Sequence, residues 1–347
     1  MVNQLLEWYH QNKRDLPWRK THDPYKIWVS EIILQQTQIQ TGTKYYHAFI
    51  KKFPNIESLS LAKERDVLKI WEGLGYYTRA INMLHAAKKI NTDYDGIFPS
   101  KYEDLIKLKG VGQYTASAIS SICYNEKKAA VDGNVYRVLT RLYNIHTPIN
   151  TIVGKKEIQN IADNLIPEKD PGSYNQAMMD FGSIHCKKSN PKCQICPLKK
   201  HCKAIKLDLV KLLPVKKLTK KITLRYFNYL LIADSEFLLI KQRKTNDIWK
   251  KLYELPLIET KSELNLNNLK SNNYLNQFNI NSIKHQYKII HILSHQKLII
   301  NFWEIKTNNK LTNYGYTQIT KQDINKYPFP KPLQNYLNKG DLKLSIQ

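Results

Sequence analysis

Four of the five cysteines lie close together near the middle of this 347-residue chain. They are Cys186, Cys193, Cys196 and Cys202, in the spacing C-x6-C-x2-C-x5-C. Cysteine thiolates bind zinc and iron–sulfur clusters, and a four-cysteine zinc site usually presents two short C-x2-C pairs, of which this chain has one. The spacing therefore favours an iron–sulfur cluster, with zinc as the alternative. A cluster held by protein at all four corners has no open position for substrate, so we expect it to organise the fold.

Two carboxylates stand in surroundings that suit acid–base chemistry. Glu31 interrupts the apolar run IWVSEIIL, so in a helix it lies partly among apolar groups, unless it is a surface residue. Burial of this kind raises the pKa of a carboxyl and keeps its proton available near neutral pH. Asp132, in AAVDGNVY, precedes a predicted helix from about Val135, which it could simply cap. Two such carboxylates suit glycosidic cleavage, in which one protonates the leaving group and the other stabilises the positive sugar.

A glycine-containing turn precedes a segment of helical character in LKGVGQYTASAI, residues 108–119. Gly110 and Gly112 allow a close approach of the backbone, and the N–H groups at the start of the following helix can bind a phosphate. The pattern is typical of a helix-hairpin-helix, although an ordinary turn between helices would look similar.

The composition favours a polyanionic partner. Lysine and arginine number 54 against 29 acidic residues, a net charge of +25, and residues 187–221 hold twelve lysines and one acid, Asp208. Such a segment contacts nucleic acid phosphates or simply faces solvent. No apolar run approaches the roughly 20 residues that cross a bilayer, and the N-terminus lacks a signal-peptide pattern. We therefore expect an intracellular protein that does not bind membranes.

The composition changes after the basic segment. TLRYFNYLLIA and EFLLIKQR predict two β-strands around a turn at Asp234 and Ser235, and KLIINFWEI at 297–305 predicts another strand. We expect a helix near residues 262–278 between them. The sequence thus predicts a second domain, of α+β type, that starts near residue 222.

Taken in order, SEIILQQTQIQ, GLGYYTRA, GVGQYTA, VDGNV, YNQAMMDFG and the cysteine pattern resemble the motifs of MutY adenine DNA glycosylases over about residues 1–205. Their helix-hairpin-helix superfamily also contains endonuclease III, which shares the cysteine spacing. Bifunctional members carry a lysine two residues after the second hairpin glycine, where this chain has Tyr114. The resemblance implies a monofunctional DNA N-glycosylase, a hydrolase of N-glycosyl bonds, with one 4Fe-4S cluster on the four cysteines.

The resemblance also implies catalytic roles. Glu31 would protonate N7 of an adenine that has been flipped out of the duplex, so that the base leaves as a neutral molecule. Asp132 would stabilise the positive sugar carbon or bond to it briefly. Asn134 would orient the site, and Tyr114 would lie against the reacting sugar. A water would complete the reaction and leave an abasic site.

Further positions match residues of the family that contact DNA, where core aromatics and solvated polar groups would otherwise be the simpler interpretation. Those that match the lining of the adenine pocket are Trp18, Arg19 and Gln176. Those that match residues entering the duplex around the opposite base are Gln36, Thr37 and Tyr76. The hairpin glycines, expected at the DNA backbone, are Gly110 and Gly112.

The C-terminal part resembles the Nudix-like, MutT-related domain of the same family. It lacks the glycine and the glutamates of the Nudix catalytic box, so we expect no pyrophosphohydrolase activity. A Phe-Ser-His loop of this domain recognises 8-oxoguanine, and here HILSHQK gives Leu293, Ser294 and His295. Leucine replaces the aromatic residue, and WKKLYELP has two lysines where the family often has glycines. Ser294 and His295 are predicted to contact the lesion, with a polar hairpin turn as the alternative.

The predicted fold is multidomain: an all-α helix-hairpin-helix glycosylase core with an iron–sulfur cluster domain, followed by an α+β Nudix-like domain. A six-helix barrel that contains the hairpin would span 25–131, and the cluster domain would combine 1–24 with 132–205. A basic linker would cover 206–221, and the lesion-recognition domain 222–347. DNA would lie in the cleft between the barrel and the cluster domain.

The sequence therefore predicts an adenine DNA glycosylase of base excision repair that acts on adenine opposite 8-oxoguanine, and opposite guanine, in double-stranded DNA. We expect a monomer in a bacterial-type cytoplasm, associated with the nucleoid. One alternative is an endonuclease III-like glycosylase/lyase acting on oxidised pyrimidines. Tyr114, at the position of the lyase lysine, argues against this alternative. The other is a damage-binding protein without catalysis, against which the intact Glu31 and Asp132 speak.

Overall fold

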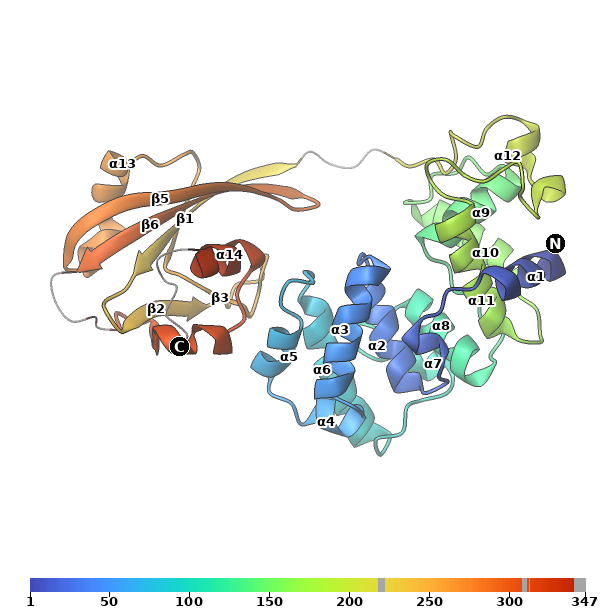
Figure 1. Cartoon of the computed structure of the whole chain (residues 1–347), viewed down its shortest axis with the longest axis horizontal. Helices are drawn as coiled ribbons and strands as arrows, with labels where there is room; N and C mark the ends of the chain where they lie inside the picture. The colour runs from blue at the N-terminus through green and yellow to red at the C-terminus, as the bar shows by residue number, and fades with distance from the viewer. Residues whose placement is uncertain (218–221, 308–310, 312, 340–347) are drawn as a thin grey trace. The chain divides into compact units, whose positions relative to one another are not determined.

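The computed structural model describes residues 1–217, 222–307, 311 and 313–339 (Figure 1). By its internal contacts the chain divides into two compact units, one comprising Met1–Ala62 with Asn82–Leu218 and the other Lys63–Ile81 with Thr219–Gln347. The second unit takes in Lys63–Ile81, a segment that the predicted six-helix barrel included. Residues 218–221 of the predicted linker lie outside the described residues. Over the part of the chain that is described, no helix combines the length and the apolar character needed to span a membrane.

The first unit is helical in its described part. Its helices are α1 (Val2–Asn12), α2 (Pro24–Leu34), α3 (Ile39–Lys52), α4 (Ile56–Ser60), α6 (Thr78–Asp93) from Asn82 onward, α7 (Tyr102–Leu105), α8 (Gln113–Tyr124), α9 (Gly133–Tyr143), α10 (Ile152–Leu165), α11 (Pro171–Asp180) and α12 (Lys203–Lys206). Short 3-10 turns cover Pro17–Arg19 and Lys199–His201, and a π-helical turn covers Phe181–His185.

Helix α2 carries Glu31 into the interior of this unit. The helix starts at Asp23, whose side chain accepts a hydrogen bond from the N–H of Tyr25. Trp28 and Val29, which lie on different sides of the helix, are both fully buried. Because α2 is apolar around most of its circumference, it packs inside the unit, and Glu31 is buried with it.

Helix α9 begins at Asp132 because of two features of the sequence. The Asp132 side chain accepts hydrogen bonds from the first N–H groups of the helix, as the capping interpretation predicts. The apolar residues that α9 buries recur at the spacing of one helical face, and they are Val135, Val138, Leu139 and Leu142. They belong to the core of this unit, so the start of α9 is fixed both by its cap and by its packing.

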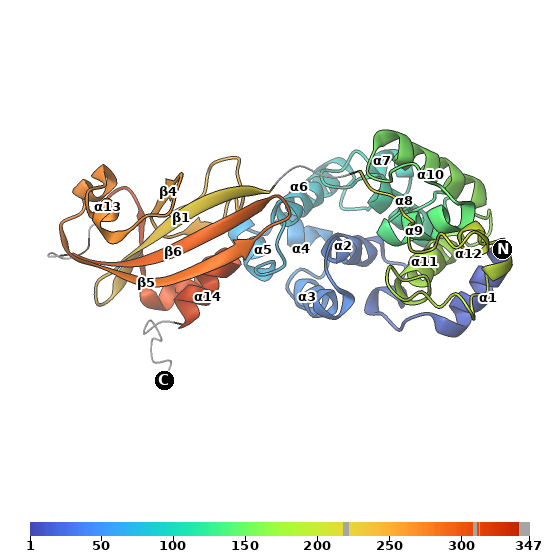
Figure 2. The same cartoon turned by 90° about the horizontal axis from the view of Figure 1, so that it is seen from above.

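The second unit consists of two β-sheets with flanking helices (Figure 2). Its strands are β1 (Thr223–Ile232), β2 (Phe237–Gln242), β3 (Tyr253–Glu254), β4 (Leu257–Thr260), β5 (Ile280–Ile292), β6 (Gln296–Thr307) and β7 (Thr317–Thr320). The four-stranded sheet has the order β4-β1-β6-β5, with β1 parallel to β6 and the other pairs antiparallel. The three-stranded sheet has the order β3-β2-β7. The helices of this unit are α5 (Glu64–Ile70), α13 (Leu266–Lys270) and α14 (Lys331–Lys339), with 3-10 turns at Asn273–Gln277 and Lys321–Lys326.

Helices α13 and α14 lie on opposite faces of the four-stranded sheet (Figure 1). Phe227 of β1 and Phe302 of β6 pack with Leu333 of α14. Leu230 and Trp303, on the opposite face of the sheet, belong to the core cluster that contains Leu269 of α13. The alternation of side chains along β1 and β6 thus supplies two cores, as expected for a sheet that is buried on both faces.

The predicted strands are confirmed as β1, β2 and β6, but the prediction of one helix over 262–278 is wrong. The structure has α13 and a separate 3-10 turn there. Asn265 caps α13, and Asn272 caps the 3-10 turn by accepting from the N–H of Tyr274. Short polar side chains that bind the local backbone compete with a continuous helix, and this segment is rich in asparagine.

Candidate active site

One cavity of about 730 Å³ in the first unit collects nine residues that the sequence analysis selected. They are Trp18, Arg19, Glu31, Gln36, Thr37, Tyr114, Asp132, Asn134 and Gln176. They come from the Pro17–Arg19 turn, from α2 and the loop after it, and from α8, α9 and α11. The fold therefore brings segments that are distant in sequence around one space, which we call the catalytic chamber.

Glu31 lies almost completely buried in the wall of this chamber, with 7% of its surface exposed. The hydroxyl of Tyr114 donates a hydrogen bond of 2.6 Å to Glu31 Oε2. Burial raises the pKa of Glu31 to about 7, although the hydrogen bond from Tyr114 acts to lower it. The charge of Asp132 raises this pKa further, and that of Arg19 lowers it. A substantial fraction of Glu31 is therefore protonated near neutral pH, as a general acid requires.

Both carboxylate oxygens of Asp132 accept hydrogen bonds from residues at the start of α9. Oδ1 accepts from the N–H groups of Asn134 and Val135 at 2.9 and 2.8 Å, and Oδ2 accepts from the Asn134 side chain at 2.7 Å. Burial raises the pKa of Asp132, while these hydrogen bonds and the charge of Arg137 oppose the rise. The carboxylate that caps α9 is thus the same carboxylate that lines the chamber, at a helix end where negative charge is favoured.

Asn134 is in turn held by a residue that the sequence analysis missed. Arg137 donates a hydrogen bond of 2.8 Å to Asn134 Oδ1, and it also donates to the carbonyls of Gly182 and Cys186. A Cβ on Gly182 would lie 2.6 Å from Asn134 Cβ, so only glycine fits at this contact. The start of α9 is therefore fixed against the chain segment that leads into the cysteine cluster. The spacing of Arg137 from Asp132 along α9 was the available signal.

Arg19 owes its position to an ion-pair network that sequence reasoning also missed. Its guanidinium donates to both oxygens of Asp180 at 2.5 and 2.8 Å, and Arg14 binds the same carboxylate. The Asp180 side chain is fully buried. Burial raises the pKa of Asp180, but the hydrogen bonds and charges of Arg19 and Arg14 outweigh this and lower it. Asp180 therefore stays ionised and holds both arginines at the chamber wall. The only signal was its place at the end of YNQAMMD.

Two other chamber residues are positioned by aromatic side chains. Trp18 is buried and packs edge-to-face against Tyr46, with 5.2 Å between ring centroids. The hydroxyl of Tyr9 donates a hydrogen bond of 2.6 Å to Gln176 Oε1. This bond directs the remaining amide donors of Gln176 away from Tyr9.

Gln36 adopts a left-handed backbone conformation in the loop between α2 and α3, with φ of 58°. A residue with a side chain pays about 1 kcal/mol or more for this conformation, so it persists where the surroundings impose it. Such strain is common at binding sites, and Gln36 lines the catalytic chamber.

A second cavity, of about 690 Å³, lies in the second unit. Its lining includes Tyr76, Leu293, Ser294 and His295. The hydroxyls of Tyr76 and Ser294 are 3.3 Å apart. Tyr76 is half exposed and has a φ of 48°, again in the left-handed region. Ser294 and His295 belong to the three-residue turn between β5 and β6, as the hairpin interpretation predicts, and both also line this cavity.

Two residues of the segment WKKLYELP, which contributes to this cavity, have a left-handed backbone conformation. Trp249 has a φ of 60° and Lys251 a φ of 72°, whereas the intervening Lys250 does not have a positive φ. Glycine adopts this conformation without a steric penalty, whereas Trp249 and Lys251 must be held in it by their surroundings. Trp249 is held in place by edge-to-face packing on Phe227.

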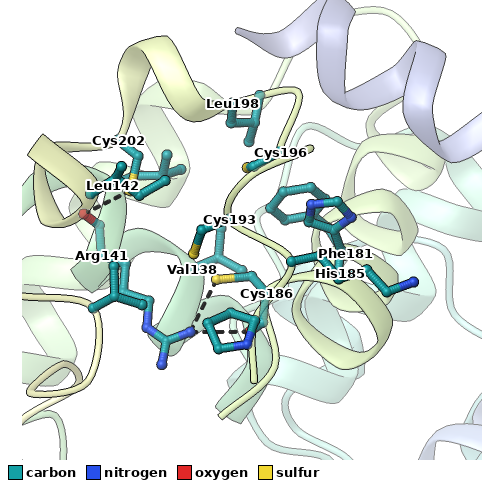
Figure 3. Close-up of a pocket in the computed structure, with 14 residues that line it drawn as sticks. Val138, Arg141, Leu142, Phe181, His185, Cys186, Cys193, Cys196, Leu198 and Cys202 are labelled. Atoms are coloured by element: carbon teal, nitrogen blue, oxygen red, sulfur yellow. Dashed lines mark hydrogen bonds between the residues drawn. The ribbon is translucent and has the colours of Figure 1, made fainter. Parts of the chain in front are cut away.

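The four clustered cysteines, which all follow α11 in the chain, line a third pocket (Figure 3). All four are free thiols, and Arg141 donates to the Cys186 sulfur at 3.3 Å. Among the described residues, no three such side chains come close enough together to ligate a single metal ion. The four cysteines nevertheless surround one space between Val138, Phe181 and Leu198.

The chain with Glu31→Gln should be more stable than the wild type at alkaline pH. The folded-state pKa of Glu31 is raised from 4.5 to about 7, so its favourable contribution is complete below about pH 4.5 and is lost as the pH rises through 7. At about pH 8 the buried carboxylate costs up to about 3 kcal/mol, which glutamine avoids. Urea denaturation at about pH 5 and pH 8 measures this gain. The exposed control Glu57→Gln should show none, and an equal pH dependence of Glu31→Gln and wild type would contradict the burial argument.

Comparison with known proteins agrees with this geometry. Residues 29–168 match the HhH-GPD superfamily of base excision DNA repair proteins, and residues 228–339 match the NUDIX domain. An adenine DNA glycosylase of Buchnera aphidicola subsp. Baizongia pistaciae is 38% identical over 90% of this chain and 90% of its own. Another, of Buchnera aphidicola subsp. Schizaphis graminum, is 36% identical over 96% of each chain. The solved structure of a thermostable thymine-DNA glycosylase covers 59% of this chain and 95% of that one, with a TM-score of 0.55 and 30% identity.

The two Buchnera relatives extend over almost the whole of both chains. The resemblance seen in the motifs is therefore confirmed along the length of the protein, in the helical unit and in the Nudix-like unit. This chain belongs to the adenine DNA glycosylase family.

Proposed function

We propose that this chain excises adenine paired with 8-oxoguanine, and adenine paired with guanine, from double-stranded DNA. The observation that carries the proposal is the pair of carboxyl groups that line one chamber in different surroundings. Burial raises the pKa of Glu31 to about 7, so a substantial fraction is protonated near neutral pH, whereas Asp132 accepts three hydrogen bonds at a helix N-terminus. This is the division of roles that glycosidic cleavage needs.

In the proposed reaction, the target adenosine leaves the base stack and enters the catalytic chamber. Glu31 gives its proton to N7, the C1′–N9 bond breaks, and its electron pair goes to the base, which leaves as neutral adenine. The Asp132 carboxylate stabilises the positive C1′ or bonds to it briefly. Water then adds its hydroxyl to C1′, its remaining proton returns to Glu31, and an abasic site is left.

The chamber offers groups that suit adenine. Trp18 supplies an aromatic surface, while Arg19 and Gln176 supply hydrogen-bond donors for the ring nitrogens. Arg19 is held by the buried Asp180, so its donors are in place before the base arrives. Gln36 and Thr37 line the same chamber, from the loop that the resemblance assigns to the duplex.

The hairpin glycines offer a backbone site for DNA phosphate. Gly112 caps the N-terminus of α8, and a Cβ at this position would meet nothing within 4 Å. Gly110 has a φ of 82°, which a glycine adopts without strain. The open first turn of α8 therefore presents N–H groups to a phosphate, and the lysines of residues 187–217 add positive charge for the rest of the backbone.

The cavity of the C-terminal unit suits recognition of the oxidised guanine. 8-Oxoguanine differs from guanine by an N7–H donor and an O8 acceptor. The Ser294 hydroxyl can both donate and accept, and it lies within reach of the exposed Tyr76. Leu293, at the position of the family's aromatic residue, is partly buried: it packs against the core of the unit and also lines this cavity.

The four cysteines fit a 4Fe-4S cluster, which would stabilise the segment after α11. They line a single pocket without forming disulfides. Burial raises the pKa of Cys196 to about 12, so its thiolate form needs a bound cationic centre. We expect about four irons and four sulfides for each chain purified without oxygen. One zinc and no sulfide per chain would contradict this assignment.

We further propose that the protein acts as a monomer in a bacterial-type cytoplasm, near the nucleoid. The net charge of +25 favours association with DNA.

The wild type should convert adenine opposite 8-oxoguanine to an abasic site that breaks only after hot alkali. The measurement is a single-turnover assay with an end-labelled duplex, beside a duplex that carries an oxidised pyrimidine. Glu31→Gln should lose excision by about a hundredfold or more while it still binds the duplex. The control Glu57→Gln should behave as wild type. Breakage at the oxidised pyrimidine without alkali would identify a lyase, and binding without breakage anywhere would identify a damage-binding protein.

Replacing Ser294 and His295 together by alanine should reduce the preference for 8-oxoguanine over guanine opposite adenine. The loss of one or two hydrogen bonds to the lesion predicts a change in the ratio of single-turnover rates of about fivefold to thirtyfold. Ser282→Ala, an exposed serine on β5, is the matched control. An unchanged ratio in the double variant would exclude this turn from lesion recognition.

A further inference from the structure

A second cavity in the same unit shares part of its lining with the catalytic chamber. It has a volume of about 390 Å³, and we call it the rear chamber. Four residues line both chambers: Arg14, Arg19, Ile122 and Gln176. The two spaces are therefore neighbours, and we call these four shared residues the partition.

The members of the partition are held with unequal strength. Arg14 and Arg19 are tied to the buried Asp180 by charge-assisted hydrogen bonds, which are the strong kind. Gln176 is held by a single neutral hydrogen bond from Tyr9, which itself lines the rear chamber. A bond of this type contributes little net free energy. Gln176 is therefore the part of the partition that can turn aside.

The proposed reaction creates a need for a second opening. The flipped nucleotide enters the catalytic chamber while it is still joined to the DNA strand, and after cleavage its sugar remains beside Asp132. The freed base then lies behind that sugar. It can return through the entrance only when the abasic strand leaves, unless another route exists.

The lining of the rear chamber includes charged side chains of both signs, and it also offers groups that can bind a heteroaromatic base. Tyr9 offers an aromatic ring, Ser173 a hydroxyl and Asn125 an amide, while Asp170 can accept from an exocyclic amine. A buried water takes up roughly 30 Å³, so a space of about 390 Å³ holds a purine base together with several waters.

We propose that the rear chamber is the exit site for the excised base: free adenine passes Gln176 into it while the abasic strand still occupies the catalytic chamber. This inference rests on the proposed excision of adenine. It assigns the rear chamber a product-binding role, and it makes Tyr9 a positioning residue that keeps Gln176 in the partition until the base is free.

The test uses a duplex whose target adenine carries a carbon-14 label, with enzyme in excess. At set times the enzyme–DNA complex is separated rapidly from small molecules, and the label that stays with it is counted. Alkali-labile sites are measured in the same samples. In the wild type the label should leave while the abasic DNA is still bound.

Ser173→Trp and His10→Trp each change a residue that lines the rear chamber, whereas Glu31 and Asp132 do not line it. Both variants should form alkali-labile sites at the wild-type rate but release labelled adenine more slowly, by about tenfold or more. Tyr9→Phe should release adenine at least as fast as wild type. Lys169→Trp, an exposed neighbour that does not line the chamber, should behave as wild type.

Three results would overturn the exit site. The wild type could retain its adenine until the abasic DNA dissociates, both tryptophan variants could release it at the wild-type rate, or they could slow cleavage itself without retaining any base. A failure of the proposed function looks different, because then no protein in the series, the wild type included, forms alkali-labile sites.

Discussion

The hydrogen bond from Tyr114 to the buried Glu31 is the interaction on which the rest of the site depends. Burial of Glu31 alone would raise its pKa further than the value of about 7, and the Tyr114 hydroxyl stabilises the ionised form enough to bring it back. The acid is therefore able both to give up its proton and to regain it near neutral pH. The tyrosine that occupies the lysine position of bifunctional relatives thus has a role of its own, as the tuning partner of the acid.

The second carboxylate is placed by different means. Asp132 caps α9, and α9 is anchored on one side by its apolar face and on the other by Arg137, which bridges Asn134 to the carbonyls of Gly182 and Cys186. A change in the cysteine segment would reach Asp132 through this chain of contacts. The cysteines can therefore matter for the reaction without touching the substrate.

Much of the site could be predicted from the sequence because its residues sit in local patterns. The charge in the apolar run around Glu31, the cap signal at Asp132 and the spacing of the cysteines are all readable within a few residues. The pairs Arg19–Asp180, Tyr9–Gln176 and Tyr76–Ser294 were not readable, since each joins positions more than a hundred residues apart. The strands β1, β2 and β6 follow from their apolar runs, whereas the broken helix near 262–278 depends on which asparagine side chains capture the backbone. The domain boundaries at residues 25, 132, 206 and 222 stay predictions.

The central claim is that burial keeps Glu31 protonated near neutral pH. The most direct test is a carbon-13 NMR titration of protein labelled at the glutamate side-chain carboxyl carbons, with Glu31 assigned by comparison with Glu31→Gln. The account predicts one resonance that is lost in the variant and titrates near pH 7 in the wild type. A Glu31 resonance that titrates near the ordinary value of 4.5 would show that the carboxyl is ionised at neutral pH, and it would remove Glu31 as the proton donor.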